Sequence, residues 1–112
     1  MEVEQRGRLE DILKAGRLIA SYVADTTLEQ FTGDSMKQDA VVRRIEIIGE
    51  ATWHLSDETR AVVPGLPFRQ MRGMRNIVAH DYANVNIEIV WEVATVHVPE
   101  MIRILEATIT LG

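Results

Sequence analysis

The chain has 112 residues, of which 46% are hydrophobic, and it contains no cysteine. A chain of this length is that of one ordinary domain, so we expect residues 1–112 to fold as a single unit. The lack of cysteine excludes disulfides, a thiol nucleophile and cysteine-based metal sites. The formal net charge of −5 argues against indiscriminate binding to nucleic acid, because affinity for phosphates comes mostly from cations.

No part of the sequence approaches the roughly 20 apolar residues that a membrane-spanning helix requires. The N-terminus is charged and has no apolar run of the kind found in signal peptides. These two observations predict a cytoplasmic protein that does not associate with a membrane.

Hydrophobic periodicity predicts helices along almost the whole chain. The first covers about residues 4–24, where apolar residues recur at three- and four-residue steps. A short helical turn follows, and it can be capped by either of two pairs, Thr26 with Glu29 or Thr27 with Gln30.

A second helix is predicted to begin at Ser35, which forms a capping-box pattern with Gln38, and to end near Leu55. Its apolar positions form an unusually wide stripe, which predicts contacts with more than one neighbour. Gly49 in this helix and Gly73 in the next are expected to mark close packing, because a helical glycine costs about 1 kcal/mol relative to alanine.

Pro67 is suited to the first position of a third helix, which would run from Phe68 to about His80. Asn84 or Asn86 can cap a fourth helix, in which Pro99 should cause a kink or a break. No segment is a compelling strand. The predicted fold is therefore all-α, a bundle of four main helices with a short extra helical turn.

The segment 75–82, Arg-Asn-Ile-Val-Ala-His-Asp-Tyr, concentrates chemically useful side chains. Arg75 is a permanent cation that can stabilise charge on a phosphate, and His80 can exchange a proton near neutral pH. This pair suits metal-free cleavage of RNA, in which the 2′-hydroxyl attacks the adjacent phosphodiester. On a straight helix the two side chains lie about 140° apart. They can cooperate if the helix ends just before His80 or if a second subunit completes the site.

The charge distribution is compatible with an RNA ligand. Four arginines and one aspartate give residues 60–82 a net charge of +3 and leave −8 for the rest of the chain. Such a locally basic face permits a small RNA footprint, with Arg69 and Arg72 as the expected RNA-binding residues beside the motif. The alternative is that these arginines only solvate a helix face.

Metal and cofactor sites are not predicted. The three histidines, His54, His80 and His97, lie in separate segments, and Glu50 and His54 lack the Glu-x2-His spacing of di-iron helical bundles. The chain has no glycine-rich loop that would cradle a phosphate cofactor and no serine-nucleophile motif.

The octapeptide at residues 75–82 resembles the Arg-x4-His-x-Tyr signature of HepT-like toxins, which are members of the HEPN (higher eukaryotes and prokaryotes nucleotide-binding) superfamily. The resemblance includes Arg-Arg-x4-Gly-Glu-Ala at residues 43–51 and Pro-Gly-Leu-Pro-Phe at residues 64–68. Phe68 stands where the family usually has tryptophan, and it keeps a large apolar ring. The pattern is continuous from about residue 9 to about residue 105.

This resemblance implies a HEPN-like helical bundle that pairs as a homodimer, with the motif in a cleft near the interface. It also implies a toxin that cleaves RNA without a metal. In that mechanism His80 activates the 2′-hydroxyl, Arg75 stabilises the charged phosphorane, and Asn76 orients the substrate or His80. Glu50 is expected to support the site by holding the Arg75 guanidinium in place.

The family pairs the toxin with an MntA-type nucleotidyltransferase antitoxin, which by resemblance adenylylates Tyr82. An AMP group on this phenol would place an anion two residues from His80, neutralise Arg75 and fill the RNA cleft. Two alternatives remain at this stage. One is a weakly active or inactive HEPN-fold protein that serves as binding partner and modification substrate of a nucleotidyltransferase, and the other is a structural helical module.

Overall fold

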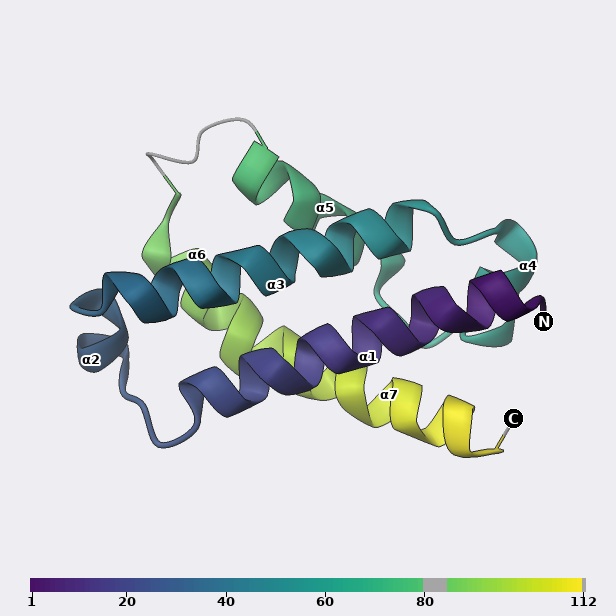
Figure 1. The fold of residues 1–112 in the computed structure, drawn as a ribbon, viewed down its shortest axis with the longest axis horizontal. Helices are drawn as coiled ribbons and strands as arrows, with labels where there is room; N and C mark the ends of the chain where they lie inside the picture. Colours follow the sequence, from purple (N-terminus) through teal and green to yellow (C-terminus); the bar gives the residue numbers. More distant parts are fainter. Residues whose placement is uncertain (80–84, 112) are drawn as a thin grey trace.

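In the computed structural model the backbone is described for residues 1–79 and 85–111, and the side chains for residues 1–74 and 85–109. All regular secondary structure in the described part is helical (Figure 1), which confirms the predicted all-α class. None of the helices in these ranges is long and apolar enough to cross a membrane. In chain order the elements are α1 (Val3–Val23), α2 (Leu28–Thr32), α3 (Ser35–Trp53), α4 (Asp57–Val62), α5 (Phe68–Ala79), α6 (Ile87–Glu92), η2 (Val93–His97) and α7 (Val98–Leu111).

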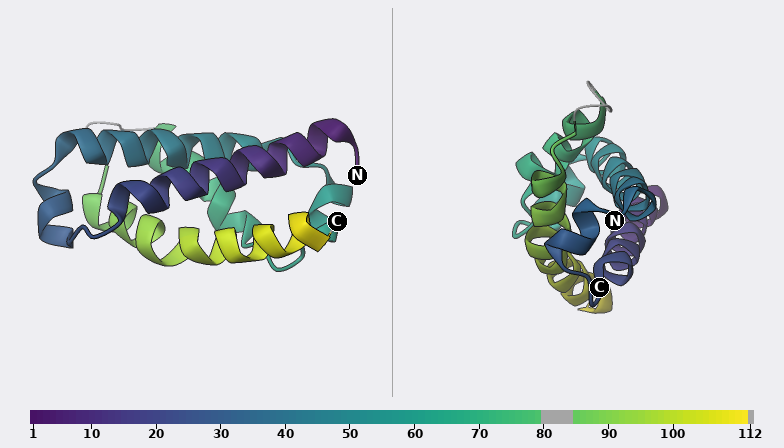
Figure 2. Two further views of the ribbon diagram at one scale, coloured as in Figure 1. Left: turned by 60° about the horizontal axis from the view of Figure 1, so that its bottom comes forward. Right: turned by 90° about the vertical axis from the view of Figure 1, so that its left-hand side faces the viewer.

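Two long antiparallel helices, α1 and α3, form the centre of the bundle and pack along each other (Figures 1 and 2). The rod formed by α6, η2 and α7 crosses behind them, and α7 packs against α1. Helix α5 packs on α3, on the side away from α1. The wide apolar stripe predicted for the second helix therefore contacts two neighbours, α1 on one side and α5 on the other.

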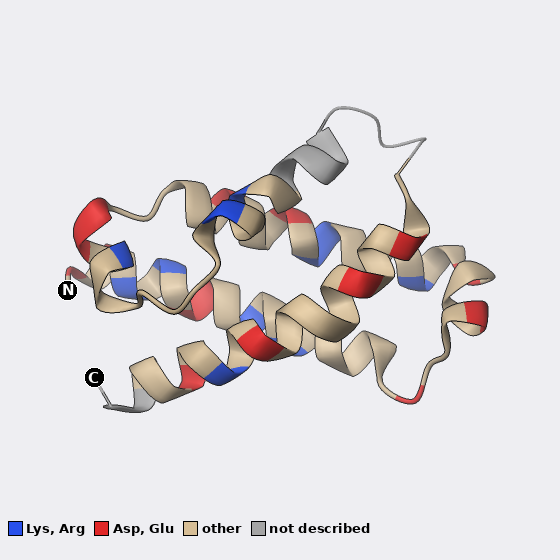
Figure 3. Ribbon diagram, turned by 180° about the vertical axis from the view of Figure 1, so that it is seen from behind, with Lys and Arg blue, Asp and Glu red and all other residues tan. Residues whose placement is uncertain are grey.

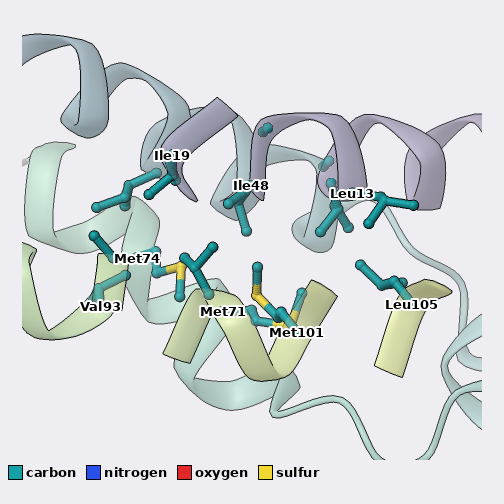
Figure 4. Close-up of a cluster of buried hydrophobic side chains, with 14 of the residues drawn as sticks. Leu13, Ile19, Ile48, Met71, Met74, Val93, Met101 and Leu105 are labelled. Carbon is teal, nitrogen blue, oxygen red and sulfur yellow. The ribbon is translucent and has the colours of Figure 1, made fainter. Parts of the chain in front are cut away.

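The core lies where α1, α3, α5 and the α6–α7 rod meet (Figure 4). Burial of these side chains supplies most of the driving force for folding, at about 25 cal/mol for each Å² of apolar surface removed from water. At one end of the bundle, the ring of Phe31 on α2 packs against Trp91 on α6, with centroids 5.2 Å apart. The largest fully buried side chains include Leu9, Ile12, Ile19, Phe31, Ile45, Ile48, Met71, Met74, Met101 and Leu105.

The predicted first helix and short turn are confirmed. α1 covers Val3–Val23, against a predicted range of about 4–24. Of the two alternative caps for α2, the second is formed: Thr27 Oγ1 accepts the backbone N–H of Gln30 at 3.1 Å, and the Gln30 side chain accepts the N–H of Thr27 at 2.9 Å. These reciprocal bonds satisfy two donors that a helix start leaves unpaired.

The predicted cap of α3 is wrong by one residue. Asp34 is the N-cap, and its carboxylate accepts the N–H of Lys37 at 3.0 Å, while Ser35 is the first helical residue. Aspartate caps helices as well as serine does, so two adjacent candidates compete. Gln38 instead reaches back to α2, where its amide donates to the carbonyls of Phe31 and Thr32. This contact joins the two helices across their short connection.

Helix α4 was not predicted, although its start carries a recognisable signal. Ser56 is its N-cap and accepts the N–H of Thr59 at 3.1 Å, and acidic residues occupy the first turn. Gln5 of α1 fixes this corner, because its amide donates to the carbonyl of His54 and accepts the N–H of Ser56. A polar residue near the start of α1 thus determines how the chain leaves α3.

The starts of α5 and α6 follow the predictions closely. The carbonyl of Pro67 accepts the N–H of Met71 at 2.9 Å, so Pro67 lies just before the first helical residue, Phe68, and not at the first helical position. Asn86 caps α6 by accepting the N–H groups of Glu88 and Ile89. The other predicted cap, at residue 84, lies outside the described residues.

The expected kink or change of segment at Pro99 takes the form of a change in helix type: α6 ends at Glu92 and α7 begins at Val98, one residue before the proline, without a gap in the helical path. The chain passes from α6 to α7 through η2, a π-helical turn in which the N–H of Val98 donates to the carbonyl of Val93. Proline lacks an N–H and its ring crowds the carbonyl four residues earlier, which is that of Thr95 inside the wider turn. The π turn therefore accommodates the proline without ending the rod.

The glycines differ in their surroundings. A Cβ atom at Gly16 of α1 would lie 3.2 Å from Ile102 Cγ1, so glycine permits the close approach of α1 and α7. Gly49 is buried, as expected for a packed position. The prediction of close packing at Gly73 is wrong, because a Cβ atom there would meet no described atom within 4 Å. Gly73 therefore makes no close side-chain contact within the described part of the chain.

Candidate functional site

Helix α5 carries most of the predicted site residues and has two distinct faces. Met71 and Met74 point into the core from this helix and are buried (Figure 4). Arg69 and Arg72 lie on its exposed side. Because the two methionines anchor α5 to the core, the two guanidinium groups extend from a helix of fixed position.

The motif residues are described only in part. Arg75 and Asn76 lie in the last turns of α5, whose bounds Phe68–Ala79 agree with the predicted third helix. The side chains of these two residues lie outside the described part of the structure. His80 and Tyr82 also lie outside it. The convergence of Arg75 with His80 therefore stays a prediction.

Arg69 and Arg72 differ from most other arginines in having no ion-pair partner among the described side chains. Elsewhere, exposed arginines pair with a nearby carboxylate at 3.1 to 3.8 Å: Arg6 with Glu10, Arg8 with Glu4, Arg17 with Glu106, Arg43 with Glu46 and Arg103 with Glu100. Arg60 pairs with Asp57. A guanidinium without a carboxylate partner keeps all its donors available for a phosphate. Helix α5 thus presents two cations that no described carboxylate neutralises.

The charge of the remaining surface favours α5 as the anion-binding face. Figure 3 shows basic residues on α5 and acidic residues along the rod of α6 and α7. The stretch 68–79 contains no aspartate or glutamate. The rod carries four glutamates against Arg103, namely Glu88, Glu92, Glu100 and Glu106. A polyanion would be repelled by the rod and attracted to α5.

Glu50 lies on α3 with its carboxylate 3.3 Å from His54 Nε2. It lines a groove of about 260 Å³ between α1 and α3. Two arginines and three carboxylates surround this groove, so it is a poor phosphate site: Arg8, Arg43, Asp11, Glu46 and Glu50. The predicted support of Arg75 by Glu50 stays a prediction, because the Arg75 side chain lies outside the described residues.

The two histidines within the described ranges each lie beside a glutamate of the same helical stretch. His54 lies beside Glu50, and His97 Nε2 is 3.9 Å from Glu92 Oε1 across the π turn. In the described part of the chain, no three His, Asp or Glu side chains form a group that could hold a metal ion. The two histidines belong to different elements and form separate pairs.

Comparison with known proteins adds evidence that is independent of this geometry. A family model described as ribonuclease HepT-like matches residues 12–108. The chain is 32% identical over 101 residues to a probable ribonuclease HepT of Thermococcus cleftensis, covering 90% of this chain and 92% of that protein. It is 34% identical over 104 residues to a Methanocaldococcus jannaschii protein described as a "putative RNase". That alignment covers 93% of this chain and 86% of that protein.

A protein of Caldanaerobacter subterraneus subsp. tengcongensis, also described as a "putative RNase", is 35% identical over 96 residues. That alignment covers 86% of each chain. No solved structure matches this chain significantly. The family match extends from the middle of α1 into α7, so it includes part or all of every helix and the whole of the helix that carries the exposed arginines.

Proposed function

We propose that this chain, which belongs to the family of HepT-like ribonucleases, is an endoribonuclease that cleaves RNA without a metal ion. The observation that carries the proposal is the pair of unneutralised arginines on α5, Arg69 and Arg72, one to two turns before the motif. Phosphate-binding cations next to a histidine that can exchange a proton form a minimal site for phosphodiester cleavage. Membership of the family supports the same activity.

In the proposed mechanism, His80 removes the proton of a ribose 2′-hydroxyl, and the oxygen attacks the adjacent phosphorus. The bond from phosphorus to the 5′ oxygen of the next nucleotide breaks, and that oxygen takes up the proton that His80 returns. The products are a 2′,3′-cyclic phosphate and a 5′-hydroxyl. Arg75 stabilises the charge that builds up on the phosphorane, and Asn76 orients the substrate or His80.

A homodimer is part of the proposal. Along an α-helix, side chains five residues apart point in directions about 140° apart, so Arg75 and a helical His80 of one chain would diverge. A two-fold axis near α5 would place Arg75 of one subunit near His80 of its partner. Shared sites of this kind would make activity depend on dimer formation.

The RNA-binding role of α5 predicts a change in salt dependence. Removing one phosphate contact should reduce the slope of log affinity against log salt by about 0.7 for single-stranded RNA. We expect this reduction for Arg69→Gln and again for Arg72→Gln, together with weaker binding at low salt. Fluorescence anisotropy with a labelled single-stranded RNA over a range of salt concentrations measures both effects.

The matched control for these variants is Arg17→Gln. It removes the same charge from α1, where Arg17 is already paired with Glu106 at 3.1 Å. We expect its salt slope to equal that of the wild type. If all three variants changed the slope equally, net charge alone would explain the binding, and α5 would not be the RNA-binding face.

The proposal extends to a toxin–antitoxin pair in which a minimal nucleotidyltransferase of the MntA type adenylylates Tyr82. Transfer of AMP from ATP to the phenol oxygen releases pyrophosphate and leaves a phosphodiester anion near the motif. That anion would compete with RNA phosphates for Arg75, and the nucleoside would occupy space that the substrate requires. Cleavage would then stop without unfolding the toxin.

This form of control predicts the behaviour of Tyr82→Phe. The variant should remain toxic, because the phenol oxygen has no role in cleavage, and should escape neutralisation, because its ring has no acceptor for AMP. Growth assays with and without the nucleotidyltransferase, and intact-mass measurement after incubation with ATP and magnesium, provide the test. Modification and silencing of the variant would instead indicate another target residue or inhibition by binding.

A further inference from the structure

Gly73 occupies a position where nothing in the described chain requires glycine. It lies within α5 and has no left-handed backbone conformation, since none of the described glycines has a positive φ. A Cβ atom added to it would meet no described atom within 4 Å. Alanine would favour the helix more, because glycine loses more backbone freedom on folding. The reason for glycine must therefore lie outside the packing of the described chain.

The partly exposed backbone at Gly73 lies beside the two arginines that have no ion-pair partner among the described side chains. At about 100° per residue, Gly73 points about 40° from Arg69 and about 100° from Arg72. It points about 160° away from Met71, which is buried in the core. The missing side chain thus exposes the helix backbone on the face that presents two unneutralised cations.

We propose that Gly73 is a contact point at which the sugar–phosphate backbone of single-stranded RNA lies directly against α5. Arg69 and Arg72 bind phosphates on one flank of this point, and the lack of a Cβ atom lets the strand approach the helix axis. The proposal rests on the ribonuclease function and adds to it a position that determines how closely the substrate can bind.

The proposed two-fold axis lies near the motif at the end of α5, and a second copy of the chain is a less suitable occupant of the surface around Gly73. Arg69 and Arg72 are both exposed here, and the stretch 68–79 contains no acidic residue. A two-fold contact centred on Gly73 would bring the arginines of one copy close to those of the other, and like charges at short range repel. A polyanion lying over the same surface would be attracted to both of them. The charge pattern therefore favours RNA.

The test compares Gly73→Ala with Gly7→Ala. Gly7 also lies within a helix, α1, and a Cβ atom there also meets nothing within 4 Å, so it is a matched control on another surface. Both variants should raise Tm by roughly 4 °C through helix propensity. Only Gly73→Ala should weaken binding to a labelled 2′-fluoro RNA, which cannot be cleaved, by about tenfold.

Salt dependence separates a steric effect from an electrostatic one. Gly73→Ala should lower affinity by a similar factor at every salt concentration, because it removes no charge, whereas loss of Arg69 or Arg72 reduces the slope. Equal RNA affinity of the Gly73→Ala and Gly7→Ala variants would overturn the proposal. A loss of dimer in Gly73→Ala by light scattering, with RNA affinity kept, would assign the surface to a second copy. Failure of the wild type to bind the RNA would refute the proposed function itself, before any variant is compared.

Discussion

His80→Ala is expected to reduce RNA cleavage by about 10² to 10⁴-fold, the usual contribution of a general acid–base group. Arg75→Ala should reduce it by about 10² to 10³-fold, because charge on the phosphorane loses a fixed cation. Both residues lie at or beyond the last turns of α5, after the methionines that anchor this helix in the core. The helical content and Tm of both variants should therefore stay close to those of the wild type. Cleavage of a labelled RNA by purified protein measures the effect.

His97→Ala is the matched control. This histidine is partly exposed in η2 beside Glu92, away from α5 in the sequence and on a different element. We expect its cleavage rate to equal that of the wild type. Arg75→Lys should recover only part of the activity, since lysine keeps the charge and loses the planar fork of donors. Full activity of His80→Ala and Arg75→Ala would show that the cleavage site lies elsewhere.

Phe31→Ala should cause the largest loss of stability, about 3 to 5 kcal/mol. The Phe31 side chain is fully buried, and its ring packs on Trp91 at a centroid distance of 5.2 Å. Its removal leaves a cavity where α2, α3 and α6 meet, and the surrounding helices cannot close it fully. Since domains are stable by only about 5 to 15 kcal/mol, this is a large share of the total. Urea denaturation followed by circular dichroism measures it.

Two further substitutions in α2 serve as controls for the stability loss of Phe31→Ala. Phe31→Leu keeps most of the apolar volume and should cost well under half as much as Phe31→Ala. Leu28→Ala, at a position 40% exposed, should change the free energy of unfolding little. A loss below about 1 kcal/mol for Phe31→Ala would mean that α2 does not contribute to the core as described.

Periodicity predicted the long helices because burial itself imposes the pattern. α1 and α3 each expose one face to solvent, so their apolar residues must recur with the helical repeat. Caps were predicted less precisely. Asp34 and Ser35 are adjacent and both can cap a helix, and Gln38, which would complete a capping box with Ser35, instead bonds to α2. The few residues around a helix start do not show contacts with another helix, so they cannot decide between two adjacent capping residues.

Other features depend on the tertiary structure and had no sufficient signal in the sequence. α4 has six residues, too few to establish a period, and its corner is fixed by Gln5 from a distant part of the chain. Proline predicted a kink or a change of segment near residue 99, but it did not predict that the change would take the form of a π turn at Val93–His97. In the sequence, Gly73 suggests close helix packing, and only the structure shows that a Cβ atom there would meet no described atom within 4 Å. The motif predicted which residue types form the candidate site. That Arg69 has no ion-pair partner among the described side chains could be seen only in the folded structure.

The chemical nature of the cleaved ends tests the central proposal most directly. Purified wild-type protein would be incubated with a labelled RNA in the presence of EDTA, and the product ends identified by mass spectrometry. Attack by the 2′-hydroxyl predicts 2′,3′-cyclic phosphate and 5′-hydroxyl ends, with cleavage undiminished by the chelator, and no cleavage at a position carrying a 2′-deoxy sugar. Products with 3′-hydroxyl and 5′-phosphate ends, or activity that returns only when a divalent metal is added, would contradict it.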